Sequence, residues 1–266
     1  MTKLYLVTAL LGVSAAAIGD QHPVLSLVID DIGYSLQQGR AAINLEGDHT
    51  YAVIPGASNA QKLAAFARQS GKEVILHLPL QASAPTVQSE PNTLDESMDE
   101  NQLRRKMVSM LSEFPGIRGI NNHMGSRLTT INYFMRPIMD SIRIYDSKLY
   151  FLDSRTTPRS IAYSEAISSG LRSISRDVFL DNQHTNIESI QLQYRIWLEK
   201  ARQRGSAVAI GHPHATTIEF LRENLPQAAQ DFRFMSVSKL IEADNTARQR
   251  DTWENYLSYL QDPALN

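Results

Sequence analysis

The chain has 266 residues, of which 42% are hydrophobic and 20% are charged, and its formal net charge is −2. This length fits one large α/β domain or two small ones, and the composition is too apolar for an intrinsically disordered chain. Because there is no cysteine, disulfides, thiolate nucleophiles and Cys-ligated zinc are excluded, and any metal needs His and carboxylate ligands. The charge balance and the absence of a Lys/Arg run give no indication of nucleic-acid binding.

Residues 1–19 have the pattern of a secretory signal peptide. Lys3 precedes an apolar run over residues 4–13, and the small residues 14–17 then form an A-x-A cleavage pattern. The apolar run is short for a membrane span, although an uncleaved membrane anchor is the alternative to a cleaved signal peptide. No second stretch of the sequence approaches the ~20 apolar residues that a transmembrane helix needs. We therefore expect an exported protein, periplasmic or secreted, without a stable transmembrane span after processing.

The first predicted strand covers residues 24–29, a continuous apolar run that is typical of a parallel strand buried on both faces. Asp30 and Asp31 follow at its C-terminal end, and Gly33 allows a sharp turn toward a helix. Successive strand residues point to opposite faces, so the two carboxylates need not have the same role. A lone pair of this kind is more often a helix cap beside a solvated acid than a functional site.

Strand and helix patterns then alternate along the chain. Short apolar runs predict further strands over residues 50–54, 73–78, 116–121, 148–152, 178–180, 207–210 and 232–235. Helical spacing of apolar residues predicts helices over residues 34–45, 59–70, 99–114, 128–145, 160–169, 187–203, 217–225 and 237–243. Asn59 and Asp99 are expected to cap two of these helices, and Pro137 is expected to kink a third.

Repeated βα units indicate a parallel sheet with helices outside it, either doubly wound or closed into a barrel. No Gly-x-Gly-x-x-Gly motif opens the first βα turn, which disfavours a dinucleotide-binding fold. Seven or eight units in ~220 residues suit an α/β fold of the (β/α) barrel type. We predict this barrel over residues 24–243 and a helical tail over residues 244–266. The polar stretch over residues 81–99 is long for a loop, and such loops are usually functional or mobile.

Acidic and histidine side chains follow the predicted strands, one strand after another. They are Asp30, Asp31, His77, His123, Asp153, Asp181, His212 and His214. In a parallel barrel the C-terminal ends of all strands open onto one face, so these side chains are expected to surround one mouth. Each histidine alone is more often structural, but together they supply the ligands that a divalent metal needs when cysteine is absent.

Five short motifs contain most of these residues. They are Ile29–Gly33 (IDDIG), His77–Leu80 (HLPL), Asn121–Ser126 (NNHMGS), Asp153–Thr156 (DSRT) and Gly211–His214 (GHPH). In this order they resemble the divergent polysaccharide deacetylases (YibQ-like), an exported bacterial family related to the NodB-type carbohydrate esterases. The resemblance covers about residues 24 to 243, and the ordered set is more specific than any single motif. It implies a distorted, seven-stranded NodB-like barrel that removes acetyl groups from a polysaccharide or a peptidoglycan-like glycan.

The resemblance also implies roles for individual residues. The first motif of the NodB-type enzymes holds a catalytic base followed by a metal-binding aspartate, which correspond to Asp30 and Asp31. His77 matches the first histidine of the second motif, but the second histidine, four residues on, is Gln81 here. We expect His123 to replace it, so that Asp31, His77 and His123 hold a divalent metal, with zinc as the expected ion.

The late histidine of the family, which protonates the leaving group, corresponds to His212, with His214 as the competing candidate. Residues expected to orient these groups or to bind substrate are Asn121, Asp153, Arg155, Asp181 and His214. The presence of Gln81 in place of the second histidine of the family motif favours a rival function, in which the barrel binds glycan or a protein partner without turnover. A metal-dependent amidase or phosphoesterase on the same scaffold is a third interpretation, because a fold does not fix a function.

Overall fold

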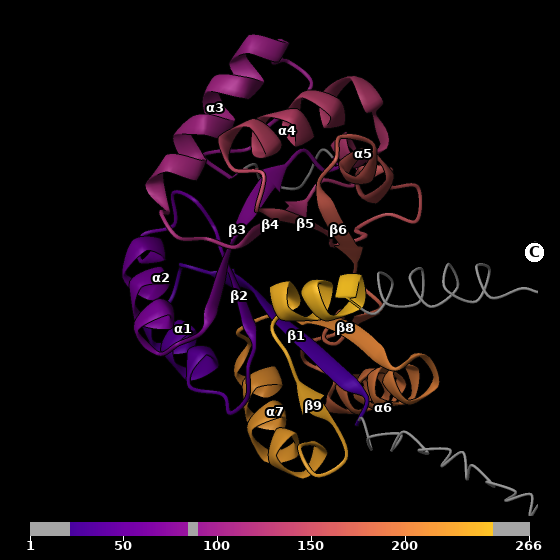
Figure 1. Cartoon of the computed structure of the whole chain (residues 1–266). Coiled ribbons are helices and arrows are strands. Elements are labelled where there is room, and N and C mark those ends of the chain that lie inside the picture. The colour runs from indigo at the N-terminus through magenta and orange to yellow at the C-terminus, as the bar shows by residue number, and fades with distance from the viewer. Residues whose placement is uncertain (1–21, 85–89, 247–266) are drawn as a thin grey trace, which may run out of the picture.

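The computed structural model describes residues 22–84 and 90–246, and in this part of the chain nine parallel strands form one curled sheet (Figure 1). The strands are β1 (Val24–Ile32), β2 (Thr50–Val53), β3 (Glu73–Leu80), β4 (Gly119–Met124), β5 (Tyr150–Asp153), β6 (Arg172–Ser175), β7 (Val178–Phe179), β8 (Ser206–Gly211) and β9 (Arg233–Phe234). The helices are α1 (Leu36–Ile43), α2 (Ala60–Gln69), α3 (Glu100–Glu113), the 3₁₀ helix η1 (Leu128–Thr130), α4 (Asn132–Tyr145), α5 (Ala162–Ser168), α6 (Ile187–Arg204) and α7 (Ala215–Ala228). Residues 237–246 form a further helix.

The strand order is β6-β5-β4-β3-β2-β1-β8-β7. β1 is central, because β8 pairs along one of its edges while β9 and β2 pair along the other, β9 at the start of the strand and β2 toward its end. β6 and β7 stand at the two ends of this order and do not pair with each other in the described part of the chain. The predicted parallel (β/α) architecture is confirmed, in the form of a barrel that stays open between β6 and β7.

The sheet has nine strands rather than the seven that the resemblance implies. β6 is missing from the sequence prediction because Arg172–Ser175 contains a single apolar residue, Ile174, and forms no apolar run. β7 and β9 contain only two residues each. β6 and β7 flank the open side of the barrel, whereas β9 pairs with the start of β1.

Some helix ends follow local sequence signals and others do not. Asp99 caps α3 as predicted, in a capping box with Gln102. Asn59 occupies the N-cap position of α2 but makes no capping bond, because its side-chain amide donates to the carbonyl of Tyr34 instead. The helix predicted over residues 128–145 is interrupted at Ile131, where the 3₁₀ helix η1 ends and α4 begins.

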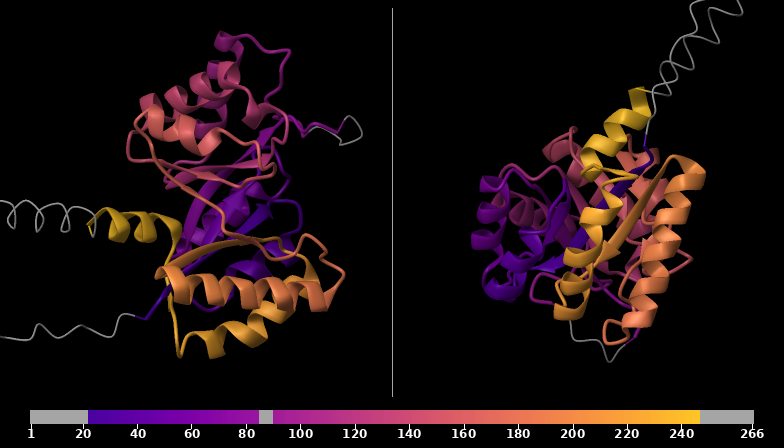
Figure 2. Two further views of the ribbon diagram at one scale, coloured as in Figure 1. Left: turned by 90° about the vertical axis from the view of Figure 1, so that its right-hand side faces the viewer. Right: turned by 90° about the horizontal axis from the view of Figure 1, so that it is seen from below.

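Alternate residues of β1 face two different cores. Leu25, Leu27 and Ile29 belong to the large hydrophobic core between the sheet and helices α1 to α7, which lie on its outer side (Figures 1 and 2). Val24 and Val28 belong to a smaller core on the inner side, where the helix of residues 237–246 packs against the sheet. This period of two sends Asp30, two residues beyond Val28, toward the interior of the barrel.

A buried carboxylate ties the helix of residues 237–246 to the sheet. Glu73, the first residue of β3, accepts hydrogen bonds from the Thr50 hydroxyl at 3.0 Å and the Tyr150 hydroxyl at 2.7 Å. It also accepts from the backbone N–H of Ser238 at 3.2 Å and from the Ser238 hydroxyl. Burial and the charge of Glu73 hold the pKa of Tyr150 well above its usual value, so this phenol remains a donor. The carboxylate also lies where the helix dipole favours negative charge.

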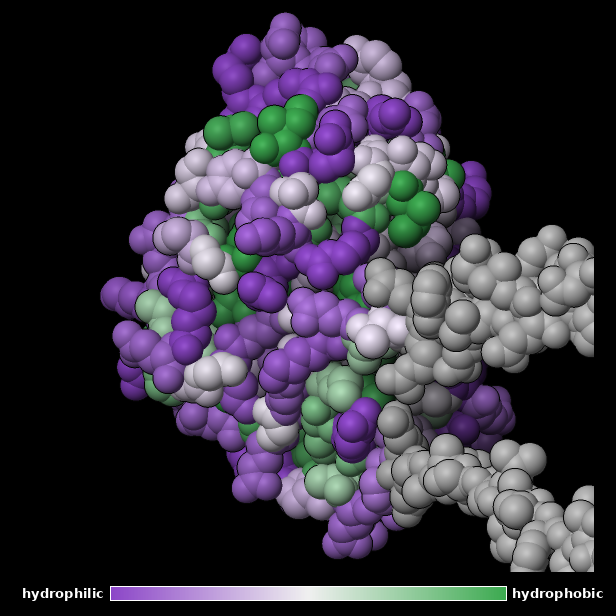
Figure 3. Space-filling model, in the orientation of Figure 1, coloured by the Kyte–Doolittle hydropathy of each residue, from purple (hydrophilic) through white to green (hydrophobic). Residues whose placement is uncertain are grey.

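The signal peptide predicted over residues 1–19 lies outside the described residues, as does the tail predicted over residues 244–266 from residue 247 onward. None of the described helices is long and apolar enough to cross a membrane. The face seen in Figure 3 is mainly hydrophilic, and its hydrophobic side chains form small, separate groups. Such isolated groups are usual on protein surfaces and indicate no particular partner.

Candidate metal centre and active site

The end of β1 carries a bulge that brings both carboxylates of the DD pair to one site. The register between β1 and β2 shifts between Ile29 and Ile32. Asp31, inside this bulge, has a left-handed backbone with φ 56°, a conformation that costs an ordinary L-residue about 1–2 kcal/mol. Because a bulge re-aims the side chains of a strand, Asp31 does not point away from Asp30 as strict alternation predicts.

Left-handed backbone recurs at the ends of the other strands that form the site. Met124, the last residue of β4, has φ 54°, and Arg155, two residues after β5, has φ 47°. Together with Asp31 they are the non-glycine residues of the described chain with positive φ. Strained conformations of this kind gather at functional sites, where the surrounding structure maintains them. The backbone conformation therefore indicates a functional site at the mouth of the barrel, independently of which side chains lie there.

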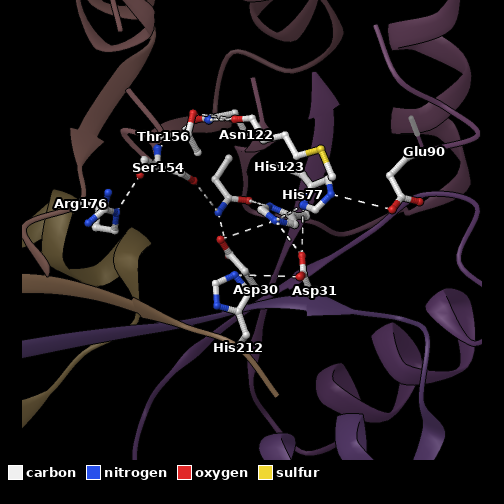
Figure 4. A network of polar contacts seen from close by, with 12 residues as sticks. Asp30, Asp31, His77, Glu90, Asn122, His123, Ser154, Thr156, Arg176 and His212 are labelled. Carbon is white, nitrogen blue, oxygen red and sulfur yellow. Dashed lines mark hydrogen bonds and ion pairs between the residues drawn. The ribbon is translucent and has the colours of Figure 1, made fainter. Parts of the chain in front are cut away.

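Three potential metal ligands meet at this mouth (Figure 4). Oδ1 of Asp31 lies 3.2 Å from Nε2 of His77 and 3.1 Å from Nδ1 of His123, and the two ring nitrogens are 3.2 Å apart. Around a tetrahedral zinc with bonds of about 2.0–2.1 Å, neighbouring ligand atoms lie about 3.3 Å apart. The triangle therefore fits a small divalent ion with little rearrangement. Oδ1 of Asp31 is also buried and forms no hydrogen bond within the described chain, although it is a strong acceptor.

Asn121 fixes which nitrogen of His77 faces the triangle. Its amide nitrogen donates to Oδ1 of Asp30 at 2.8 Å and to the Ser154 hydroxyl at 3.2 Å. Its carbonyl oxygen therefore points at Nδ1 of His77, 2.7 Å away. Since a carbonyl oxygen only accepts, Nδ1 of His77 carries the proton, and the lone pair of Nε2 is left for a metal.

The pKa values of the two aspartates shift in opposite directions. Burial raises the pKa of Asp30, which is 2% exposed. Burial also opposes ionisation of Asp31, but the imidazoles of His123 and His77 hold the pKa of Asp31 well below its usual range. The same carboxylates raise the pKa of His77 against the opposing effect of burial. Two neighbouring carboxylates in a largely dry site need positive charge, which a divalent cation supplies.

His123 has a second partner on the long loop over residues 81–99. Its Nε2 is buried without a hydrogen bond in the described chain and lies 3.9 Å from Oε1 of Glu90. Gln81, which stands where the family motif has a histidine, lies outside the triangle, because its side-chain oxygen accepts from the backbone N–H of Glu96 at 2.9 Å. The third potential ligand of the triangle is instead His123, from the neighbouring strand β4.

His212 faces the triangle from β8. Its Nδ1 is 2.9 Å from Oδ1 of Asp181, and Oδ2 of Asp181 accepts from the backbone N–H of His212 at 2.7 Å and from the Thr217 hydroxyl at 2.8 Å. Burial lowers the pKa of His212, but the hydrogen bond and charge of Asp181 outweigh this and raise the pKa to about 9. Nε2 of His212, 4.0 Å from Oδ2 of Asp31, therefore carries a proton at neutral pH.

His214 has a different environment. Its ring stacks on His184, with centroids 4.1 Å apart, and its centroid lies 5.8 Å from that of His212. Burial lowers the pKa of His214. Asp181, His212 and His214 could form a second group of metal ligands, with ligand atoms within 4.8 Å. Both oxygens of Asp181 already accept hydrogen bonds, however, which makes this group a weaker candidate than the triangle.

Asp153 and Arg155 lie apart from the triangle. Oδ1 of buried Asp153 accepts from the backbone N–H of Arg155 at 2.8 Å, and Oδ2 accepts from the Ser160 hydroxyl at 2.9 Å. Asp153 therefore stabilises the turn after β5 and contacts none of the expected ligands. The side chain of Arg155 is exposed at the rim of the neighbouring cavity.

A cavity of about 350 Å³ opens beside the triangle. Its lining includes Asp30, His77, His123, Arg155, Arg176, Phe179 and His212. Arg176 and Phe179 are absent from the sequence prediction, as is Glu90. Recognition of β6 would have identified Arg176, because this residue directly follows the C-terminal end of that strand, as the other site residues follow theirs. Glu90 has no such signal, since it lies in a long loop without periodicity.

Residues 27–241 match the family model described as divergent polysaccharide deacetylase. The chain belongs to this family. It is 34% identical over 233 residues to the uncharacterized protein YibQ of Escherichia coli K12, covering 88% of this chain and 71% of YibQ. It is 32% identical over 216 residues to an uncharacterized protein of Haemophilus influenzae, covering 81% of this chain and 76% of that protein.

A solved structure shares the deacetylase-family fold described above. It is the crystal structure of an uncharacterized protein from Agrobacterium tumefaciens C58, with a TM-score of 0.76 and 22% sequence identity. The match covers 84% of this chain and 90% of the other. The family assignment confirms the resemblance drawn from the five motifs.

Proposed function

We propose that this divergent polysaccharide deacetylase is an exported, metal-dependent hydrolase that removes acetyl groups from a polysaccharide or a cell-wall glycan. The observation that carries the proposal is the triangle of Asp31, His77 and His123, with Asp30 and His212 beside it at the mouth of a cavity. Export is proposed from the signal-peptide pattern of residues 1–19.

Asp31, His77 and His123 would hold the metal, and zinc suits this donor set of one carboxylate and two imidazoles. When bound, such an ion lowers the pKa of water to about 7 and polarises a carbonyl group. Asn121 keeps His77 in the tautomer that binds a metal. The left-handed backbone of Asp31 aims its carboxylate into the triangle, where it would be available to hold the metal.

Asp30 is the proposed base and His212 the proposed acid. Asp30 lies against the triangle, with Oδ2 3.6 Å from Nε2 of His77, and its raised pKa suits a carboxylate that takes up a proton from water during the reaction. His212 holds a proton on Nε2 and would deliver it to the departing sugar nitrogen or oxygen. Asp181 orients His212 through Nδ1 and stabilises its charged form.

The rival function, binding without turnover, was suggested by the missing histidine at Gln81. The position of His123 favours the enzyme, because its Nδ1 completes three donors within 3.2 Å of one another. A protein that only binds glycan has no need for a buried carboxylate, a strained and half-buried aspartate and a charged histidine around one cavity.

The experiment that tests the proposed function is acetate release from N-acetylated and O-acetylated glycan oligomers. Purified protein is assayed with added zinc, after removal of metal by a chelator, and after metal is restored. We expect release that stops on chelation and returns with the metal. Folded, metal-loaded protein that releases no acetate from either type of oligomer would favour the rival function.

A further inference from the structure

An arginine that the proposed reaction does not use lines the cavity beside the triangle. Arg176 lies between β6 and β7, and its Nε donates to the carbonyl of Ser154 at 2.7 Å (Figure 4). Its Nη2 donates to the carbonyl of Arg155 at 2.9 Å, and the guanidinium stacks over the ring of Phe179 at 4.9 Å. These contacts fix the orientation of the guanidinium on the wall of the cavity.

The remaining donors of Arg176 have no protein acceptor in the described part of the chain. Nη1 and the second N–H of Nη2 form no hydrogen bond there, and the carboxylates of Asp30, Asp153 and Asp177 act on the guanidinium through charge without a described ion pair within 4.0 Å. The other half-buried arginine near the barrel opening, Arg172, has a described carboxylate partner, Glu242, at 3.8 Å. A partly buried guanidinium with a fixed, unused edge matches the two oxygens of a carboxylate.

We propose that Arg176 binds a carboxylate of the substrate, so that the protein acts on an anionic acetylated glycan. This inference rests on the proposed function and names the class of its substrate. Arg155, exposed at the rim of the same cavity, adds positive charge along the path of such a ligand. A singly charged carboxylate suits the site better than a doubly charged phosphate, because Asp30 lines the same cavity and the carboxylate of Asp31 lies close behind it, on the other side of His77 Nε2.

Two other roles of Arg176 are compatible with its position. In the first, Arg176 does no more than fix the backbone by donating to the carbonyls of Ser154 and Arg155. In the second, it acts solely through the effect of its charge on Asp30, which lines the same cavity. Neither role discriminates between a neutral and an anionic sugar. The test therefore compares ligands that differ in one carboxylate.

The ligands are the methyl glycosides of N-acetylglucosamine, N-acetylmuramic acid and N-acetylglucosamine 6-phosphate. The second carries a carboxylate on a lactyl ether and the third carries a phosphate. Their dissociation constants are measured by calorimetry or by ligand-detected NMR on the zinc-loaded wild-type protein, Arg176→Gln, Arg176→Lys and Arg105→Gln. Arg105 is an exposed residue of α3, so its variant removes the same charge far from the cavity.

We expect the wild type to bind the carboxylate sugar at least about tenfold more tightly than the neutral sugar, as one charge-assisted hydrogen-bonded pair provides. Arg176→Gln should lose this preference while its affinity for the neutral sugar stays within about twofold. Arg176→Lys should retain part of the preference, and Arg105→Gln should retain all of it. Because this test measures affinity and not acetate release, a protein that shows this pattern but releases no acetate contradicts the proposed function and not the role of Arg176.

Three results would overturn the inference. The first is equal affinity of the wild type for the carboxylate and neutral sugars, which needs no variant. The second is an unchanged carboxylate preference in folded Arg176→Gln. The third is tighter binding of the phosphate sugar than of the carboxylate sugar. If Arg176 acts only on Asp30, Arg176→Gln lowers the rate of acetate release equally on neutral and anionic substrates and leaves the ratio of their KM values unchanged.

Discussion

At the scale of single residues, Asn121 has the most specific task, because it connects Asp30 to His77 and sets the tautomer of that imidazole. We predict that Asn121→Ala weakens metal binding about 10- to 100-fold, the usual effect of removing the group that orients a ligating histidine. Titration of the chelator-treated protein with zinc measures the affinity. Asn101→Ala, on the exposed face of α3, is the control and should bind zinc as the wild type does. Equal affinities of the two variants would contradict the role of Asn121.

His212 separates the acid role from metal binding. We predict that His212→Ala keeps its metal but loses at least ~10²-fold in turnover of an acetylated glycan, and loses less on an activated ester whose leaving group needs no proton. As an acid, His212 acts while it is protonated, so the activity falls as the pH rises through its raised pKa. Asp181→Asn removes the cause of that increase and should move this alkaline limit to lower pH. Equal losses on both substrates, or an unmoved limit, would argue against His212 as the acid.

At the scale of elements, the bulge at the end of β1 determines how the two aspartates are used. The left-handed φ of Asp31 is free of strain only for glycine. In the presence of a chelator we therefore predict that Asp31→Gly is more stable than Asp31→Ala by about 1 kcal/mol, as measured by urea unfolding. The same pair of substitutions at Asn101, inside α3, should show the opposite order, since glycine is the poorer helix former. The same order at both positions would mean that Asp31 is not held in this conformation.

The helices and strands also show which parts of the structure could be predicted from the sequence. The order of βα units and the meeting of Asp31, His77 and His123 follow from apolar runs and strand ends, which are local patterns. The bulge at Asp31 is not visible in the sequence, because its backbone conformation depends on the pairing of β1 with β2. Arg176 is missed because β6 lacks an apolar run, and Asp153 is over-interpreted because a carboxylate after a strand can equally stabilise the next turn.

At the scale of the whole molecule, one buried histidine links stability to pH. His49 is fully buried, its Nε2 is 2.6 Å from the carbonyl oxygen of Glu46, and its Nδ1 has no partner in the described chain. Burial lowers the pKa of His49 to about 4, so below pH 6.5 the unfolded chain takes up a proton that the folded chain does not. The contribution of His49 to stability is therefore lost as the pH falls from about 6.5 to about 4.

We predict that this loss amounts to about 2 kcal/mol between pH 7.5 and pH 5. His49→Phe keeps a ring beside Phe234, with which the imidazole now makes an edge contact at 5.1 Å, but it does not titrate. Urea unfolding at the two pH values should show a smaller decrease in stability for His49→Phe than for the wild type. The difference between the two decreases isolates His49 from the other titrating groups. Equal decreases would show that His49 is not buried in its neutral form.

The metal content of the protein tests the central claim most directly. Protein purified without a chelator or a His-tag is measured by inductively coupled plasma mass spectrometry, as wild type and as five variants. We predict about one divalent metal per wild-type chain, retention in Asp30→Asn and His212→Ala, and loss to below about a tenth in Asp31→Asn, His77→Ala and His123→Ala. Folded wild-type protein without metal, or loss in Asp30→Asn with retention in Asp31→Asn, would contradict the account.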